Sequence, residues 1–447
     1  MSLLLVTVIS LLGIILGKIL FKKWFNHLTL YCIIMGGLIF FYELKLLPYN
    51  NISALAWFYI ISSFLAFVLG IITITTSKKL DTNHQRFSKN ENISLPIFAD
   101  DGKTLQYSVL FFSVIGLFVA LQRWYVLVNM FGSIPAVLVN AAVIYRLNVH
   151  QEIKDFIPIL PAFVYVAVFL SGIYTAYKGR FSFLSFFPFI GIILKELTYF
   201  GRAELLLVLM EFVFSFLLFR HFLNTDSAQR FKFSKRNAIV ATTLLLTLLI
   251  TSASFIRMSR GNYENYTGAS RELKKMKENM ILTPSVYLYL SSDVGVFSKY
   301  LESGGENVKF GENTFFLGHV FLYRIGIIEK PDFFPKGYYI PMWSNTGTYL
   351  RELHADFGIA GIFLVPYLIG LLITWFWFKF FEEKSLITFS FLVYFYLIIG
   401  FSFLTLVTKL NQWYISLFLI VLILPIVEKI AMNRKESEFI GSLNAGI

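Results

Sequence analysis

The feature that most constrains this chain is a series of long apolar runs, repeated along most of its 447 residues. Each run approaches the roughly 20 residues that an α-helix needs to cross the hydrocarbon core of a bilayer. Soluble domains are less apolar than this chain, of which 57% is hydrophobic, and they lack such repetition. About eleven runs are predicted as transmembrane helices: residues 3–20, 28–42, 54–76, 106–128, 156–177, 181–199, 203–219, 238–256, 357–378, 386–406 and 413–427. The sequence therefore predicts an all-α polytopic membrane protein.

Basic residues set the predicted orientation of these helices. Lys and Arg gather in the short loops after the first, third, fifth, seventh and ninth runs and in the C-terminal tail. Because basic short loops stay cytoplasmic, we expect the N-terminus outside and the C-terminus inside. The first run lacks a basic segment before it and a cleavage site after it, so it is predicted to be a retained helix. This topology accounts for the net charge of +12 without a nucleic-acid partner.

A long polar segment interrupts the apolar pattern before the last three runs. It divides the chain into residues 1–256 with eight predicted helices, a large outer (periplasmic) loop at residues 257–356, and residues 357–447 with three helices and a cytoplasmic tail. Thr283 and Pro284 predict the start of a helix within this loop, because a threonine cap followed by proline is typical of helix N-termini. The loop is therefore expected to be partly helical.

Further signals subdivide the outer loop. Ser303 and the two glycines after it predict the end of that helix. A second helix is predicted from Asn313 through Tyr323. Residues 271–280 place their apolar side chains on one side and their lysines elsewhere, which is typical of a helix on a membrane surface.

Polar side chains crowd together where the loop meets the ninth run. If residues 348–355 are helical, Arg351 and His354 share a face, because residues three apart are neighbours on a helix. His354 is the best candidate for a general base, since its ordinary pKa of about 6.5 suits proton abstraction near neutral pH. Glu352 and Asp356 are alternatives, as bases or as groups that orient the imidazole. The competing interpretation is an interfacial histidine at a helix start, with Asp356 favoured by the helix dipole.

Arginine is the informative residue type near the outer helix ends. A planar guanidinium binds two phosphate oxygens at once, so a cluster can hold a diphosphate without a metal. The alternative is that these side chains reach into headgroups or pair with loop acids. Arg202 lies between two runs with almost no loop, and ionisable residues held at the bilayer are usually functional. The candidate substrate or diphosphate ligands are Arg202, Arg257, Arg260, Arg351, Arg324, Arg146, Asn345 and Tyr349.

Several common chemical signals are missing from the sequence. It has no phosphate-binding glycine loop, no His-Glu-x-x-His and no Asp-x-Asp pair, so neither a metal site nor a cofactor is predicted. Cys32 is the only cysteine, which excludes an intrachain disulfide. The energy for a reaction is then expected from the substrate's own leaving group or from a gradient.

One family shares these features. The Gly201-Arg202 turn, the Asn345-Thr346 pair and the segment from His354 to Gly361, placed around a large outer loop before the last three helices, resemble the bacterial oligosaccharide repeat-unit polymerases. These are also called O-antigen polymerases of the Wzy type. Members are described with an Arg-x10-Gly pattern in outer loops. Arg257 and Gly268 fit that spacing, whereas Arg351 reaches Gly361 and misses it by one residue.

The resemblance implies a membrane glycosyltransferase of the GT-C fold class in the bacterial cytoplasmic (inner) membrane. Its substrates would be undecaprenyl-diphosphate-linked oligosaccharides, joined at the outer leaflet into O-antigen of lipopolysaccharide, capsule or exopolysaccharide. Arg202, Arg257, Arg260 and Arg351 would bind the donor diphosphate, and His354 or a nearby acid would activate the acceptor hydroxyl. The aromatic residues Tyr338, Tyr339, Trp343 and Tyr349 would stack on sugar rings or, alternatively, lie in the membrane interface. Partners would be the lipid bilayer, and also a chain-length regulator and a flippase.

Three other classes of protein stay open at this point. An O-antigen ligase shares the fold class and the outer loop but transfers glycan to a lipid core. A lipid-linked oligosaccharide flippase is a transporter, and flippases tend to have short loops and more helices. A peptidoglycan polymerase of the cell-division or rod-shape type carries an acidic outer-loop motif that this sequence lacks.

Overall fold

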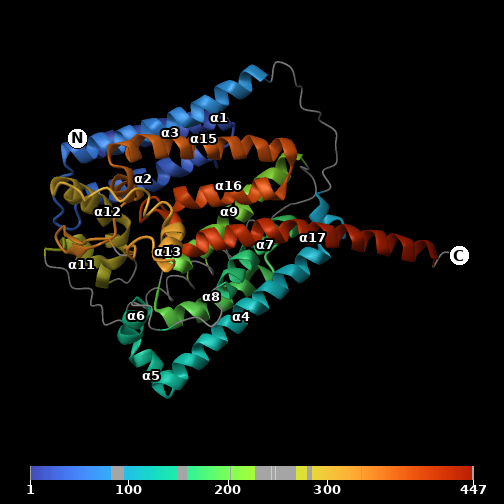
Figure 1. The fold of residues 1–447 in the computed structure, drawn as a ribbon. Coiled ribbons are helices and arrows are strands. Elements are labelled where there is room, and N and C mark those ends of the chain that lie inside the picture. The colour runs from blue at the N-terminus through green and yellow to red at the C-terminus, as the bar shows by residue number, and fades with distance from the viewer. Residues whose placement is uncertain are drawn as a thin grey trace. The chain divides into compact units, whose positions relative to one another are not determined.

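The computed structural model describes residues 2–81, 95–149, 153, 159–201, 203–226, 243, 247, 268–278, 284–333 and 335–444. Within these ranges the chain is almost entirely α-helical (Figure 1). The described strands are the two-residue pair Tyr338–Tyr339 (β1) and Trp343–Ser344 (β2), which run antiparallel with Tyr339 opposite Trp343.

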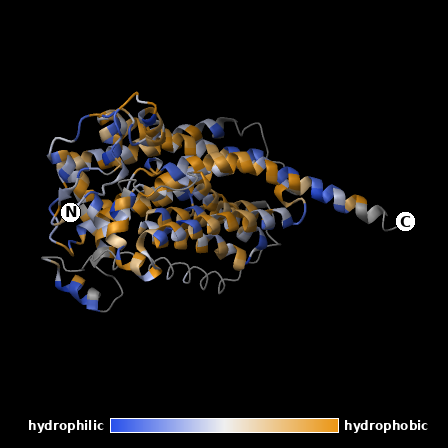
Figure 2. Cartoon of the chain, turned by 60° about the horizontal axis from the view of Figure 1, so that its bottom comes forward, coloured by the Kyte–Doolittle hydropathy of each residue, from blue (hydrophilic) through white to orange (hydrophobic). Residues whose placement is uncertain are grey.

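Long apolar helices dominate the described chain, and seven of them are long and apolar enough to cross a membrane. These helices are α1 (Ser2–Phe21), α3 (Ala54–Asp81), α4 (Lys103–Phe131), α7 (Phe163–Lys178, preceded by the 3-10 turn η2, Leu160–Ala162), α9 (Ala203–Asp226), α15 (Ile359–Glu383) and α17 (Asn411–Asn444). Figure 2 shows apolar residues along these helices and a hydrophilic stretch toward the C-terminal end of α17. The prediction of an all-α chain with many helices able to span a membrane is confirmed.

The remaining predicted spans are shorter or not described. Two are short apolar helices, α2 (His27–Glu43) and α16 (Leu386–Phe401). A third, α8 (Phe183–Tyr199), has 17 residues and contains Pro188. The predicted span at residues 238–256 lies outside the described residues, apart from positions 243 and 247. The structure therefore supports many spans without establishing eleven.

The helices predicted within the polar loop are present. They are α11 (Arg271–Glu278), α12 (Pro284–Glu302), α13 (Phe316–Arg324) and α14 (Tyr349–Phe357). α12 begins at the predicted proline and ends just before Ser303. The other described elements are α5 (Ile134–Val139), α6 (Ala141–Val149) and the 3-10 turns η1 (Pro96–Phe98) and η3 (Val407–Lys409).

The chain forms two compact units, each assembled from separate stretches of sequence. Unit 1 comprises Met1–Phe87, Glu264–Glu382 and Tyr394–Tyr414. Unit 2 comprises Ser88–Tyr263, Glu383–Val393 and Ile415–Ile447. Unit 1 therefore holds the helices α11 to α14 together with α1, α2, α3 and most of α15.

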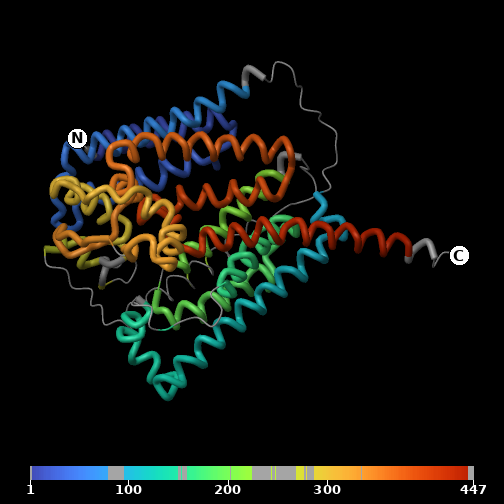
Figure 3. Tube along the Cα trace, viewed as in Figure 1, coloured from blue at the N-terminus to red at the C-terminus, as the bar shows by residue number. Residues whose placement is uncertain are grey.

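In unit 1 the helices α3 and α15 pack closely, and α15 directly follows α14, the helix that carries Arg351 and His354. A Cβ on Gly70 of α3 would lie 2.1 Å from the Tyr367 carbonyl oxygen, and one on Gly370 of α15 would lie 2.2 Å from the Phe67 carbonyl oxygen. The two backbones approach this closely because both contact positions are glycine, the usual device of tightly packed membrane helices. α12 contacts both α3 and α14, and Figure 3 shows this part of the chain at the end of unit 1 where α15 begins. α14 leads directly into α15 through Gly358.

Unit 2 is a separate helical bundle in which α4 packs against α8 and α7 packs against α9. Polar side chains are buried among these helices. Lys195 of α8 hydrogen-bonds to the Glu204 carboxylate of α9 and lies 3.5 Å from a carboxylate oxygen of its neighbour Glu196. Tyr165 donates a 2.7 Å hydrogen bond to the same Glu204. The pairing of Lys195 with a neighbouring helix satisfies a charge that would otherwise be costly to bury.

Candidate functional site

The site is built on α14, a short helix between the loop and the span α15. Thr348 precedes it in an extended conformation, and Gly358 ends it with φ of +59°, which favours glycine. Arg351 and His354 lie one turn apart and both contact Tyr300 of α12, so the predicted shared face is confirmed. The structure thus brings the fixed cation and the titratable base together.

His354 is half-buried and held by α12. Its Nδ1 lies 2.9 Å from the Tyr300 hydroxyl, and the Tyr300 and Tyr59 rings pack around the imidazole. Gly305, with φ of +77°, passes so close that a Cβ there would lie 3.3 Å from His354 Cε1. Burial lowers the pKa of His354 below its ordinary value, because the charged imidazolium is poorly solvated there. The imidazole is therefore neutral at neutral pH, as a general base must be.

The hydrogen bond between Tyr300 and His354 fits two tautomers, in which Nδ1 either donates to the hydroxyl or accepts from it. The Tyr300 hydroxyl already accepts a 3.3 Å hydrogen bond from the Glu306 backbone N–H. Burial raises the pKa of Tyr300 to about 12, so it remains a neutral phenol. If His354 donates from Nδ1 to this hydroxyl, the Nε2 lone pair is available to accept a proton. Among the described residues the structure records no hydrogen-bond partner for Nε2.

Among the residues that the structure describes, Arg351 is the largest fully buried side chain, with 1% of its surface exposed. One Nη2 contact is to the Glu306 carboxylate at 2.9 Å and another is to the Lys336 carbonyl at 2.6 Å. Nη1 donates to the Asn345 carbonyl at 3.2 Å. The guanidinium carbon also lies 5.4 Å from the Tyr300 ring and 5.3 Å from the Tyr338 ring. Arg351 therefore anchors the loop around His354 with its own hydrogen-bonding groups.

Glu352 points to the other side of α14, into a buried polar contact. Its carboxylate accepts hydrogen bonds from the Thr405 hydroxyl at 2.6 Å and from the Leu406 backbone N–H. Lys409 lies 3.9 Å away. Burial raises the pKa of Glu352 and lowers that of Lys409. These contacts fasten α14 to the segment between α16 and α17 and leave the carboxylate facing protein.

Asp356 is fully buried, and its carboxylate binds Asn313 and Thr314, a contact that we call the Asp356 clamp. One carboxylate oxygen accepts from the Asn313 backbone N–H at 2.9 Å and from its side-chain amide at 2.7 Å. The other accepts from the Thr314 backbone N–H and hydroxyl, both at 2.7 Å. Four donors occupy this carboxylate, so it resembles a side-chain cap that fixes the turn before α13. Of the three predicted bases, His354 alone keeps an accessible edge.

Two important residues were not found by sequence reasoning. Tyr300 and Asp293 lie seven residues apart on α12, so they share its face toward α14. Asp293 accepts a 2.7 Å hydrogen bond from Thr346, and burial raises its pKa to about 8. The available signal was a single carboxylate within the apolar face of a predicted helix, at a spacing of two turns from a tyrosine.

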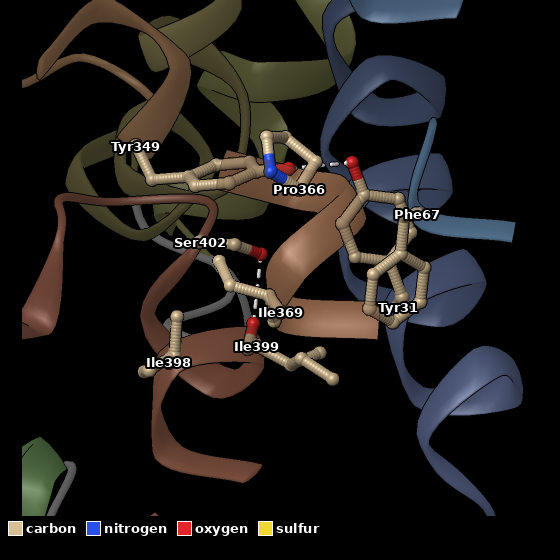
Figure 4. A pocket seen from close by; sticks show the side chains of 8 residues that line it. All are labelled: Tyr31, Phe67, Tyr349, Pro366, Ile369, Ile398, Ile399 and Ser402. Carbon is tan, nitrogen blue, oxygen red and sulfur yellow. Dashed lines mark hydrogen bonds between the residues drawn. The ribbon is translucent and has the colours of Figure 1, made fainter. Parts of the chain in front are cut away.

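Other predicted ligands lie apart from His354 or contribute backbone only. Asn345 offers its carbonyl to Arg351. Tyr349 is buried, and its hydroxyl lies 2.9 Å from that of Tyr31 and 3.0 Å from that of Ser63. It lines a small, mainly apolar pocket together with Phe67, Pro366, Ile369 and Ser402 (Figure 4). Arg324 is exposed at the end of α13, and Arg146 is exposed on α6 of unit 2.

The predicted aromatic residues differ in their exposure. Tyr338 is buried against Arg351, whereas its strand neighbour Tyr339 and the opposing Trp343 are exposed. Arg202, Arg257 and Arg260 lie outside the described residues. No group of three or more His, Cys, Asp and Glu side chains among the described residues is placed to hold a metal ion.

Comparison of the chain with protein-family models, with curated proteins and with solved structures gives no match. The functional conclusion therefore depends on the chemistry of the site.

Proposed function

We propose that this chain is a membrane glycosyltransferase that polymerises undecaprenyl-diphosphate-linked oligosaccharide repeat units. The observation that carries the proposal is His354, a neutral and half-buried imidazole held at Nδ1 by Tyr300 and placed five residues before a membrane span begins at Ile359. A base near the membrane surface can reach the sugars of a substrate whose lipid tail lies in the bilayer and whose sugars lie in water. The sequence features shared with repeat-unit polymerases support the same reaction.

In the proposed reaction, Nε2 of His354 accepts the proton of an acceptor sugar hydroxyl. The hydroxyl oxygen attacks the anomeric carbon of the donor glycan as the bond from that carbon to the diphosphate oxygen breaks. The departing undecaprenyl diphosphate takes the electron pair of that bond. Donating Nδ1–H to Tyr300 holds the imidazole in the tautomer that this step requires, and a positioned general base typically contributes a factor of about 100 to 10,000 in rate.

Arg351 has a positioning role in this scheme. Its hydrogen bonds to Glu306, Lys336 and Asn345 bring two loop segments together beside His354. The direct diphosphate ligands are proposed to be Arg202, Arg257 and Arg260, on the sequence argument alone. Guanidinium groups there would stabilise the charge that develops on the leaving group.

A reconstituted assay tests this function. The purified full-length protein would be placed in vesicles with an undecaprenyl-diphosphate repeat unit as the only glycan, and products would be separated by size. The proposal predicts a ladder that depends on His354. Transfer only after a lipid-core acceptor is added would overturn polymerisation in favour of ligation. Movement of the glycolipid between leaflets with no new glycosidic bond would overturn both in favour of transport.

A further inference from the structure

The turn and helix before α14 carry an unexpected set of exposed apolar side chains. Phe310 and Phe321 are 84% and 63% exposed, and Ile327 is 64% exposed. Their neighbours Phe315, Tyr323 and Ile325 are exposed as well. These six residues, which we call the apolar tip, lie within residues 310–327. Soluble surfaces rarely gather so many large apolar groups without a partner.

Hydrogen bonds and ring contacts fix the apolar tip to the beginning of α15. The Lys309 backbone N–H donates to the Ala355 carbonyl at 3.0 Å. The Phe310 ring lies 6.3 Å from the Phe357 ring, two residues before α15 begins. The Asp356 clamp holds the next turn of the segment. The tip therefore cannot lie far from the level at which α15 enters the membrane.

A second attachment joins the same segment to the beginning of α17. The Tyr414 hydroxyl donates to the Thr314 carbonyl, and the Thr408 hydroxyl lies 3.5 Å from the Asn313 carbonyl. Tyr414 belongs to the first turn of α17, another membrane-spanning helix. The beginnings of α15 and α17 therefore fix the depth of residues 313–315 relative to the membrane, just before α13 begins.

The chemistry of the tip matches a lipid surface. Large aromatic and aliphatic side chains stand beside the exposed Arg324, and this mixture is typical of segments that lie at the boundary between headgroups and acyl chains. Exposed apolar side chains also occur on the first turns of α15, at Ile359 and Leu364, shortly after the Phe357 ring that Phe310 contacts. A soluble protein partner would not require this proximity to a membrane span.

We propose that the apolar tip is inserted in the bilayer surface on the side of the membrane where His354 lies. The insertion would hold α13 and the Asp356 clamp at the depth of the lipid headgroups. This inference depends on the membrane-spanning helices and not on the reaction proposed above.

Site-directed spin labelling of the full-length protein tests the insertion. Phe321→Cys and Ile327→Cys would be labelled in a Cys32→Ser background and reconstituted in vesicles of phosphatidylcholine and phosphatidylglycerol. The matched control is Glu302→Cys at the exposed end of α12, which lies outside the tip. Elution as a single species and an unchanged helix content would confirm that each variant folds.

Collision with oxygen, which concentrates in lipid, would be compared with collision with a water-soluble nickel complex. The inference predicts that both tip labels favour oxygen by several-fold relative to the control label. Tip labels that favour nickel as strongly as the control would overturn it. Labels that are immobile and shielded from both reagents would also overturn it, because they would show that protein covers the tip.

Discussion

Replacing Asp356 with asparagine distinguishes two roles of its carboxylate, a structural role as the clamp on residues 313–314 and a catalytic role. In the structure the two carboxylate oxygens accept four hydrogen bonds from Asn313 and Thr314. An asparagine keeps one acceptor oxygen and turns an NH₂ group toward the donors of the other pair. Two hydrogen bonds to a charged acceptor are lost, and at about 1.5 kcal/mol each, the low end of the usual range, the loss is about 3 kcal/mol.

Amide hydrogen exchange measures this loss where it occurs. If the Asn313 and Thr314 amides exchange through local opening, about 3 kcal/mol corresponds to exchange on the order of 100-fold faster. Thr314→Val removes only the hydroxyl donor, so it should accelerate exchange about tenfold, as expected for one bond of about 1.5 kcal/mol. Peptides from the middle of α12 should exchange at the wild-type rate in both variants.

The reasoning fails if exchange at residues 313–314 stays within threefold of the wild type in Asp356→Asn while glycosyl transfer is abolished. That outcome would make Asp356 a chemical participant and return it to the list of candidate bases. If Asp356 acts only as a clamp, the residual activity of the folded Asp356→Asn variant should show the same dependence on pH as the wild type.

Three further predictions follow from the same contacts. Because the pKa of His354 is lowered, transfer should be lost only as pH falls through a value below about 6.5, and a pH–rate profile with its midpoint above 7 would contradict this. Tyr300→Phe removes one neutral hydrogen bond to the imidazole, so kcat should fall about tenfold with little change in KM, and an unchanged kcat would refute the tautomer assignment. Asp293 keeps its proton in the folded state up to about pH 8 but ionises near pH 4 when unfolded, so folding stability should decline between these values, by about 1.4 kcal/mol for each pH unit. The Asp293→Asn variant should lose that slope in thermal unfolding measured at pH 6 and pH 8, and a slope equal to that of the wild type would show that Asp293 does not titrate as described.

The sequence was most informative where local rules act alone. Proline at the first position of α12, the serine and glycines after its end, and the spacing of Arg351 and His354 on α14 depend on neighbouring residues only, and each prediction is confirmed. The span pattern was likewise readable from composition, although α2 and α16 proved short.

The contact partners of each candidate side chain could not be predicted from the sequence by such local rules. Glu352 and Asp356 have the same charge and lie near His354 in sequence, yet their partners come from residues 405–409 and 313–314. Such contacts depend on tertiary packing, and no spacing rule predicts them. Tyr300, which holds the imidazole, lies 54 residues away in the chain.

The most direct test of the account compares wild-type protein with His354→Gln in vesicles that contain an undecaprenyl-diphosphate repeat unit, with the initial rate of glycosidic bond formation as the readout. Glu352→Gln serves as the matched control, because its carboxylate contacts Thr405 and Lys409 and faces away from His354. The account predicts a loss of at least about 100-fold in His354→Gln, with lipid-linked substrate still bound, and a control that keeps most of its activity per folded molecule. A His354→Gln rate within threefold of the wild type would contradict the account, because no base at this position would then be needed.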